Sequence, residues 1–148
     1  MTIKVNVLIN ADVEKVWGII SDIENSINVI TAINKIEVLN KPAEGLVDLK
    51  WRETRTMFGK EATEVMWITE AVENHHYKTR AESHGSVYIS ELSVMKQNGG
   101  IELTMAFGAE PQTFGAKFMW ATMGFMFKGS TKKALQQDLE DIKVAAEA

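Results

Sequence analysis

Two charged residues, Glu53 and Arg55, fall on the apolar side of a strand predicted over residues 46–57. The apolar residues on that side are Leu49, Trp51 and Met57. A carboxylate and a guanidinium are tolerated inside a protein only when they are paired or solvated. Two interpretations are open. Either the strand passes the edge of the core and both side chains reach water, or the pair lines a largely apolar cavity and contacts the polar group of a small molecule.

Glu64 is a second acidic candidate, on the strand that follows a predicted turn at Phe58 and Gly59. A shift of one residue in the pairing exchanges the two faces of a strand, so the sequence leaves open whether Glu64 or Val65 faces inward. If the turn has two residues, Glu53 lies opposite Glu64. Two facing carboxylates in a site of low dielectric favour protonation of one of them, which suits general acid/base catalysis.

Tyr88 is a third candidate for contact with a ligand. It shares one side of a predicted strand with Ser90 and Leu92, whereas Glu91 lies on the other, largely apolar side. Its hydroxyl group can orient a bound molecule, and the alternative is an ordinary core or surface tyrosine.

The spacing of the three histidines does not indicate a metal site. His75 and His76 are adjacent at a predicted turn, and His84 lies at another. Neighbouring residues on a strand point to opposite sides, so this adjacent pair is poorly placed to chelate one ion. The sequence also lacks a serine-hydrolase elbow, a phosphate-binding loop and a dinucleotide fingerprint. We therefore expect no cofactor.

Residues 114–127 form an unusually apolar segment in which only Lys117 is charged. A helix that is apolar on every side is expected to be buried all round, and this one is shorter than the roughly 20 residues that cross a bilayer. We therefore expect no transmembrane segment and a core helix, part of which, including Phe118 and Met123, lines a deformable pocket. The alternative is that residues 118–127 are partly exposed and dock a protein partner. The acidic residues further on, Asp138 among them, belong to the polar side of an ordinary amphipathic continuation.

The composition indicates one soluble domain over residues 1–148. The chain is 45% hydrophobic and 24% charged, with a formal net charge of −4, which gives no basic surface for a nucleic acid. Its lack of cysteine excludes disulfides and thiolate chemistry. The first residues do not form a signal peptide, so we expect a cytoplasmic protein.

The elements that must position these residues follow from periodicity and turn signals. Residues 3–9 alternate like a half-buried strand, and Asp12 stands as the N-cap of a short amphipathic helix. A second short helix follows near residues 23–30. Residues 33–108 then alternate between strands and turns, which is typical of an antiparallel meander, and residues 113–146 predict one long or kinked helix. The fold class is therefore α+β.

The chain resembles the START-like (SRPBCC) superfamily, and within it the polyketide cyclase/dehydrase and lipid-transport group. The residues that carry the resemblance are Ile9-Asn10-Ala11-Asp12-Val13-Glu14-Lys15-Val16-Trp17, Ser21-Asp22, Trp51, Glu53, Arg55, Gly59, Glu64, Tyr77 and Gly85. The resemblance implies a helix-grip fold. In this fold a curved seven-stranded antiparallel sheet wraps around a long C-terminal helix, two short helices follow the first strand, and a hydrophobic cavity lies between sheet and helix.

The leading hypothesis for function is the binding of a hydrophobic or amphipathic small molecule, lipid-like or polyketide-like, in an internal cavity. Its body would contact Trp51, Met57, Phe118 and Met123, and its polar group would lie near Glu53, Arg55 and Tyr88. One alternative is a cyclase or dehydratase in which Glu53 or Glu64 is the acid or base and Arg55 stabilises an enolate. A protein-interaction module is the other. We expect a monomer or a weak homodimer, and the sequence leaves ligand identity and catalysis open.

Overall fold

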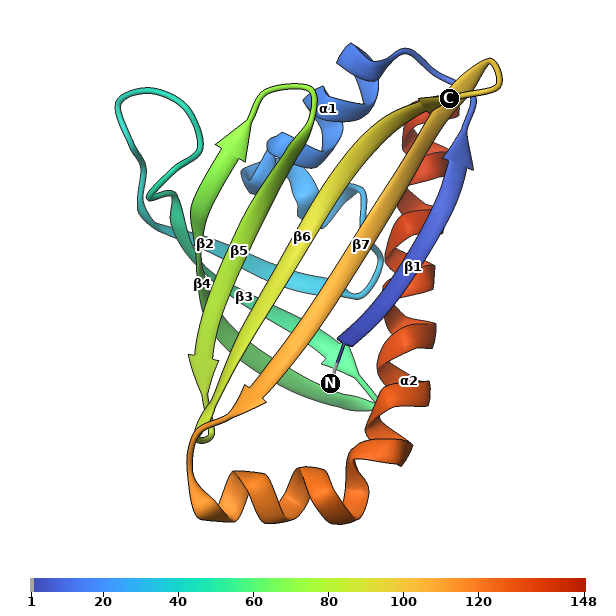
Figure 1. Cartoon of the computed structure of the whole chain (residues 1–148). Helices are drawn as coiled ribbons and strands as arrows, with labels where there is room; N and C mark the ends of the chain where they lie inside the picture. Colours follow the sequence, from blue (N-terminus) through green and yellow to red (C-terminus); the bar gives the residue numbers. More distant parts are fainter. Residues whose placement is uncertain (1) are drawn as a thin grey trace.

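The computed structural model describes residues 2–148, apart from the side chains of residues 125 and 126. It consists of a curved seven-stranded antiparallel sheet, a long C-terminal helix and two short helices after the first strand (Figure 1). The strands are β1 (Thr2–Ile9), β2 (Ile33–Asn40), β3 (Lys50–Met57), β4 (Lys60–Val72), β5 (His76–Ser83), β6 (Ser86–Gln97) and β7 (Gly100–Pro111). The helices are α1 (Val13–Ser21), the 3₁₀ helix η1 (Ile23–Asn28) and α2 (Phe114–Glu147). The predicted fold class and helix-grip architecture are confirmed.

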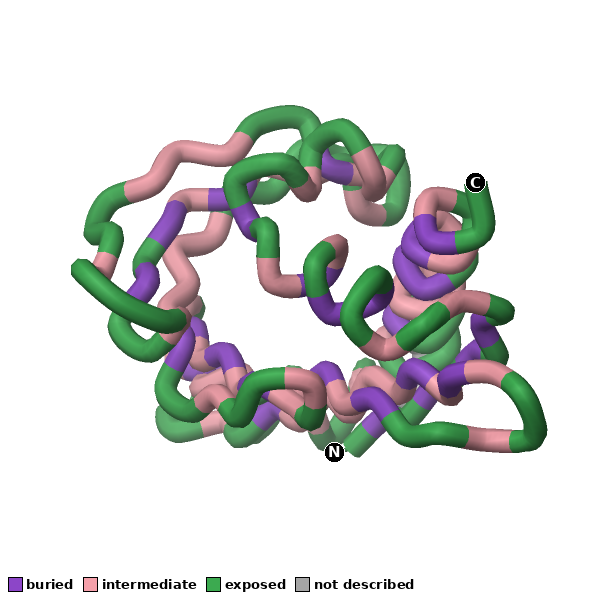
Figure 2. Tube along the Cα trace, turned by 90° about the horizontal axis from the view of Figure 1, so that it is seen from above, coloured by how far each residue is buried: buried purple, intermediate pink, exposed green. Residues whose placement is uncertain are grey.

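The sheet runs in the order β1-β7-β6-β5-β4-β3-β2, so the consecutive strands β2 to β7 form a meander and β1 joins its far edge. Along β1, exposed and buried residues alternate as the sequence predicts, with Ile3, Val5, Val7 and Ile9 buried. Figure 2 shows the same alternation along other strands and the curvature of the sheet seen from above. The buried side of each strand faces the helices, and that face is the inner face of the sheet.

The two short helices cover one end of the inner face. Asp12 precedes α1 as expected, although its side chain makes no capping hydrogen bond. Val16, Trp17 and Ile20 of α1 are buried. They share the core with Ile9, Ile68, Leu103, Leu139 and Ile142, among others. The packed core therefore lies at the α1 end of the sheet.

The register of β3 and β4 settles which face each acidic residue occupies. Phe58 and Gly59 form a two-residue turn with φ values of 54° and 76°, the positive values that a tight hairpin requires. Glu53 consequently pairs with Glu64 across the hairpin. Glu64 lies on the inner face beside Glu53, and Val65 lies on the outer face.

The predicted start of β3 was wrong by four residues. The strand begins at Lys50 because residues 46–49 form a turn, in which the N–H of Leu49 donates to the carbonyl of Leu46 at 3.0 Å. Asp48 in this turn has a φ of 75°, which is incompatible with a regular strand.

The long helix α2 begins after Thr113, whose side chain accepts a hydrogen bond from the N–H of Ala116. It bends (Figure 1): the first part, orange, runs across one end of the sheet, and the second part, red, runs along the sheet beside β1. The second part packs mainly against β1, β7 and α1.

Side chains of the second part of α2 bond to the free backbone groups of β1. The amide of Gln136 donates to the carbonyl of Asn6 at 3.1 Å, and Lys143 Nζ donates to the carbonyl of Leu8 at 2.8 Å. At the end of the helix, Glu147 accepts a hydrogen bond from the N–H of Asn10 at 2.7 Å. These contacts attach the helix to the second half of the strand and to the residue that follows it.

The expectation that residues 114–127 are buried all round was wrong. Phe114 is 86% exposed, Phe118 63%, Met119 40% and Met123 45%. The bend explains the difference, because a helix that crosses the end of a sheet has only one side to bury. Phe125 and Met126 belong to the same apolar segment, and their side chains lie outside the described part of the chain.

Candidate functional site

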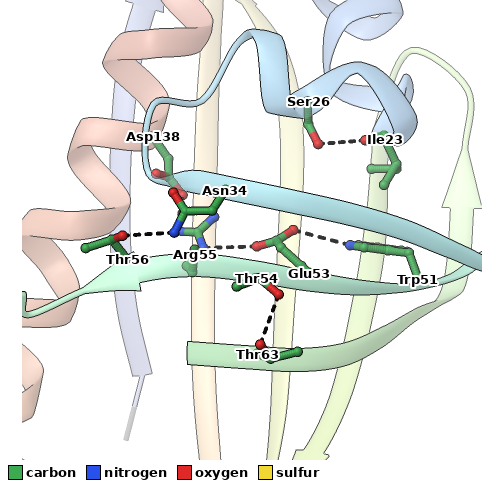
Figure 3. Close-up of polar contacts among 10 residues, drawn as sticks. All are labelled: Ile23, Ser26, Asn34, Trp51, Glu53, Thr54, Arg55, Thr56, Thr63 and Asp138. Atoms are coloured by element: carbon green, nitrogen blue, oxygen red, sulfur yellow. Dashed lines mark hydrogen bonds and ion pairs between the residues drawn. The ribbon is translucent and has the colours of Figure 1, made fainter. Parts of the chain in front are cut away.

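The centre of the candidate site is an ion network of three side chains on the inner face. Arg55 Nε lies 3.0 Å from Glu53 Oε2, and Arg55 Nη1 lies 3.0 Å from Asp138 Oδ2. The indole N–H of Trp51 donates to the other oxygen of Glu53 at 3.2 Å. Figure 3 shows the guanidinium of Arg55 between the two carboxylates, one from β3 and one from α2. The network therefore joins the sheet to the helix.

This network is largely removed from water. The side chains of Arg55, Glu53 and Asp138 are 16%, 10% and 6% exposed. Burial works against the charge on Arg55, but Asp138 and Glu53 outweigh it and raise the pKa of the guanidinium. Burial also raises the pKa of Asp138, although Arg55 opposes this effect. Within the described part of the chain, Oδ1 of Asp138 is buried and has no hydrogen-bond partner.

Sequence reasoning expected Glu53 and Arg55 to form a pair and missed the third member. The prediction that Asp138 lies on the polar side of the helix was wrong, because Asp138 is only 4% exposed. Asp138 precedes the buried Leu139 and lies four residues before the buried Ile142. An acid on the apolar side of a helix is the signal that could have indicated a buried cationic partner.

Beyond the network, the inner face continues as a largely apolar wall with two polar groups. Tyr88 pairs with Ala81 and Ala109 on the neighbouring strands, and its ring stacks on Phe107 at a centroid distance of 5.9 Å. Glu64 lies on the same face. The apolar residues of this wall are Met57, Met66, Met105 and Phe107, and each is only partly buried.

The structure separates the predicted lining residues into two groups. Trp51, Glu53, Arg55, Met57 and Tyr88 all lie on the inner face. Phe118 and Met123 do not join them, because both are exposed on the first part of α2. Glu91 lies on the outer face, since its neighbours Ser90 and Leu92 share the face of Tyr88.

The histidines take no part in this site. His76 bonds to Glu70 at 2.6 Å near the end of β4, and His84 bonds to Ser83 at a hairpin turn. Among the residues that the structure describes, no group of three His, Cys, Asp or Glu side chains could hold a metal ion. The same part of the chain contains no helix that is long and apolar enough to cross a bilayer.

A separate hollow of about 350 Å³ lies between residues 11–14 and 96–101, on the surface at the α1 end of the sheet. It is open to solvent, and its lining includes Asp12, Glu14 and Lys96. It does not contain any residue of the ion network.

The sequence of the chain matches the family described as polyketide cyclase / dehydrase and lipid transport over residues 1–147. The chain belongs to this family. The predicted resemblance to the START-like superfamily is thereby confirmed. No curated protein matches this member of the family.

Solved structures of similar shape support the same fold for this polyketide cyclase/dehydrase and lipid-transport family member. TTHA0849 from Thermus thermophilus has a TM-score of 0.81 at 13% identity, over 99% of this chain and 97% of that one. The Zhui aromatase/cyclase from Streptomyces sp. R1128 has a TM-score of 0.79 at 14% identity, over 99% and 93%. A START superfamily protein from Mycobacterium smegmatis has a TM-score of 0.69 at 16% identity, over 95% and 98%. At such identities the likeness concerns the fold.

Proposed function

We propose that this protein binds a hydrophobic or amphipathic small molecule between the inner face of the sheet and α2. The observation that carries the proposal is a contrast along two strands. Ile68 on β4 and Leu103 on β7 are 0% exposed. Met66 and Met105, the next residues on the same inner face, are only partly buried. Both pack against the core but keep part of their surface open, and we infer that this part of the apolar wall contacts the ligand.

The polar groups at this wall would orient the bound molecule. Glu64 and Tyr88 project from the inner face beside the apolar residues, and the Arg55 network lies where β3 approaches α2. Burial of an apolar body supplies most of the affinity in a site of this type, and a few convergent polar groups set the orientation. A lipid-like or polyketide-like molecule with one polar end fits this distribution. Its body would lie against Met57, Met66 and Met105, whereas Trp51 is 3% exposed and belongs to the packed core.

The test begins with native mass spectrometry of the purified protein, followed by solvent extraction and mass analysis of any molecule released. Binding is then measured by titration with the fluorescent probe 1-anilinonaphthalene-8-sulfonate. Met66→Gln is expected to weaken the probe about tenfold, because it places an amide in the apolar wall. Val65→Gln is the matched control. The side chain of Val65 lies on the outer face, so its replacement leaves the inner face unchanged.

Equal affinities of the two variants and the unmodified protein would contradict the proposal. A thermal melt of each variant shows that the comparison is made between folded proteins.

A cyclase or dehydratase activity is the second candidate, and the pairing of Glu64 with Glu53 favours it. Glu53 already accepts hydrogen bonds from Trp51 and Arg55, which leaves Glu64 as the candidate acid or base. Arg55 would stabilise a developing enolate. With a polyketide-like substrate, Glu64→Gln is expected to lower kcat by a factor of about 100 or more while KM changes little. An unchanged kcat would exclude this role.

A further inference from the structure

The first part of α2 presents an apolar surface that the proposed ligand site does not use. We name residues 114–127 the strap, because this segment crosses the open end of the sheet (Figure 1). Its outward side carries Phe114 and Phe118, which are 86% and 63% exposed. Met119 and Met123 lie towards its flanks and are 40% and 45% exposed. Single exposed apolar residues are common, but two exposed phenylalanines on successive turns of one helix side, with exposed methionines beside them, form a patch that needs an explanation.

The inward side of the strap is attached to the sheet at two hairpins. At its start, the carbonyl of Gly85 in the β5–β6 turn accepts hydrogen bonds from the N–H groups of Gln112 and Thr113 at 2.7 and 3.3 Å. Further along the strap, the indole N–H of Trp120 donates to Ser86 Oγ at 3.4 Å. The strap is therefore held in one orientation.

At its other end, the ring of Phe127 packs edge-on against Phe58 of the β3–β4 turn, at a centroid distance of 6.3 Å. Phe58 is itself 54% exposed and adds to the apolar patch. The positions of Trp120 and Phe127 fix which side of the helix faces the protein. Phe118, which lies two residues before Trp120, is thereby directed outward.

The charges around the patch indicate what covers it. Between Glu110 and Asp138 the sequence holds four lysines and no acidic residue, although the whole chain has a net charge of −4. These lysines are Lys117, Lys128, Lys132 and Lys133, and all are exposed. On the neighbouring strands, Lys60 of β4 adds a positive charge beside Phe58, and Glu61 of β4 and Glu110 of β7 are acidic. A basic helix with exposed Phe and Met side chains is typical of a segment that lies on an anionic lipid surface.

We propose that the strap docks this protein on the surface of an anionic membrane. Phe114 and Phe118 enter the boundary between headgroups and acyl chains, and Lys117 contacts lipid phosphates together with the lysines that follow the strap. The acidic remainder of the chain is repelled by the same surface, so the strap is the face that approaches it. A second copy of the chain fits less well, because packing two straps together brings their lysines together as like charges.

The test is co-sedimentation of the whole protein with vesicles. One set contains phosphatidylcholine alone, and the other about seven parts phosphatidylcholine to three parts phosphatidylserine. We expect binding to the anionic vesicles that falls as salt is added. Phe118→Ser is expected to lower the partition coefficient about tenfold, because one large apolar side chain no longer leaves water. Lys117→Gln is expected to lower it about fivefold.

The matched control is Met95→Ser, which removes an apolar side chain that is 61% exposed on β6. It is expected to leave vesicle binding unchanged. Failure to bind anionic vesicles, or equal binding to neutral ones, would overturn the proposal. So would a dimer, detected by light scattering, that Phe118→Ser dissociates, since a second copy would then cover the patch. Met66→Gln, which alters the inner face, is expected to bind the vesicles like the unmodified protein, and this result keeps the test separate from that of the proposed ligand site.

Discussion

The replacement Arg55→Met provides a quantitative test of the ion network. The substitution keeps an apolar stem of similar length and removes the guanidinium that bonds to Glu53 and Asp138 at 3.0 Å each. Glu53 keeps its hydrogen bond from Trp51. Asp138 loses the partner of Oδ2, and its Oδ1 already has none within the described residues. The variant thus leaves two nearby carboxylates, both largely buried, without a cation.

The expected cost follows from two independent arguments. Breaking a buried ion pair by removing one partner costs about 3–5 kcal/mol. Alternatively, one carboxyl group becomes protonated; at 1.36 kcal/mol per pH unit, this costs about 4 kcal/mol at neutral pH for a group with the ordinary pKa of 3.8. Both arguments give a loss of about 4 kcal/mol in the free energy of unfolding, which corresponds to a fall of roughly 10 °C in Tm for a domain of this size.

The pH dependence of this loss distinguishes a charge effect from a packing effect. Burial raises the pKa of Asp138, and Arg55 opposes the rise, so removing Arg55 raises this pKa further. A carboxyl group with a raised pKa binds more protons in the native state than in the unfolded state. The native state therefore gains stability as the pH falls through that pKa. The loss caused by Arg55→Met is expected to shrink between about pH 7 and about pH 5.

Urea unfolding at the two pH values measures the effect, with Arg52→Met as the matched control. Arg52 lies on the same strand and pairs with Glu37 at 3.0 Å, but the two side chains are 42% and 38% exposed. Such a surface pair contributes about 0–1 kcal/mol. Equal losses for the two variants, or a loss for Arg55→Met that does not change with pH, would refute the reasoning.

Three further predictions concern the two tyrosines and one turn. Tyr77→Phe removes the hydrogen bond of 2.9 Å from the buried hydroxyl to the carbonyl of Ile20, and urea unfolding is expected to show a loss of about 1 kcal/mol. Burial raises the pKa of Tyr77, and it also raises the pKa of Tyr88, which is less completely buried. The variant Tyr88→Phe keeps Tyr77 as its one tyrosine. An ultraviolet titration of this variant is therefore expected to show ionisation only at the pH where circular dichroism reports unfolding. Gly85→Ala places a Cβ against the side chain of Thr113, at a residue whose φ is 74°. The free energy of unfolding is expected to fall by about 1–3 kcal/mol. An unchanged Tm would contradict the attachment of the strap at this turn.

Much of the fold could be predicted because its signals are local. The alternation of Ile3, Val5, Val7 and Ile9 determines which side of β1 is buried, and the turn at Phe58 and Gly59 suits a tight hairpin. These features depend on residues close together in the sequence. The register of β3 on β4 follows from the same turn, so the inward position of Glu64 required only the knowledge that the turn has two residues.

The position of Asp138 could not be predicted in the same way. Its burial depends on Arg55, which lies 83 residues away in the sequence and on another element. A periodic pattern assigns a charged residue to the solvent because an unpaired buried charge is costly. Only the packing of α2 on the sheet brings the compensating cation within 3.0 Å.

The exposure of Phe118 has a different cause. The sequence of residues 114–127 is apolar on every side, and burial is the ordinary consequence. Where a helix bends relative to a sheet is decided by packing over the whole inner face, and this bend directs one side of the strap to the solvent. The sequence pattern identified residues 114–127 as unusually apolar. The packing of the helix on the sheet determined which of these side chains are exposed.

The attachment of α2 to β1 also affects whether a strand of another molecule can pair with the edge of this sheet. An edge strand with free carbonyl and N–H groups is a template for a strand of another molecule. On β1 the carbonyls of Asn6 and Leu8 are occupied by Gln136 and Lys143. At the opposite edge, β2 is interrupted by register shifts between Ile33 and Lys35 and between Val38 and Asn40. Both features make the edges of the seven-stranded sheet poorer templates for an added strand, which counters growth into a fibril.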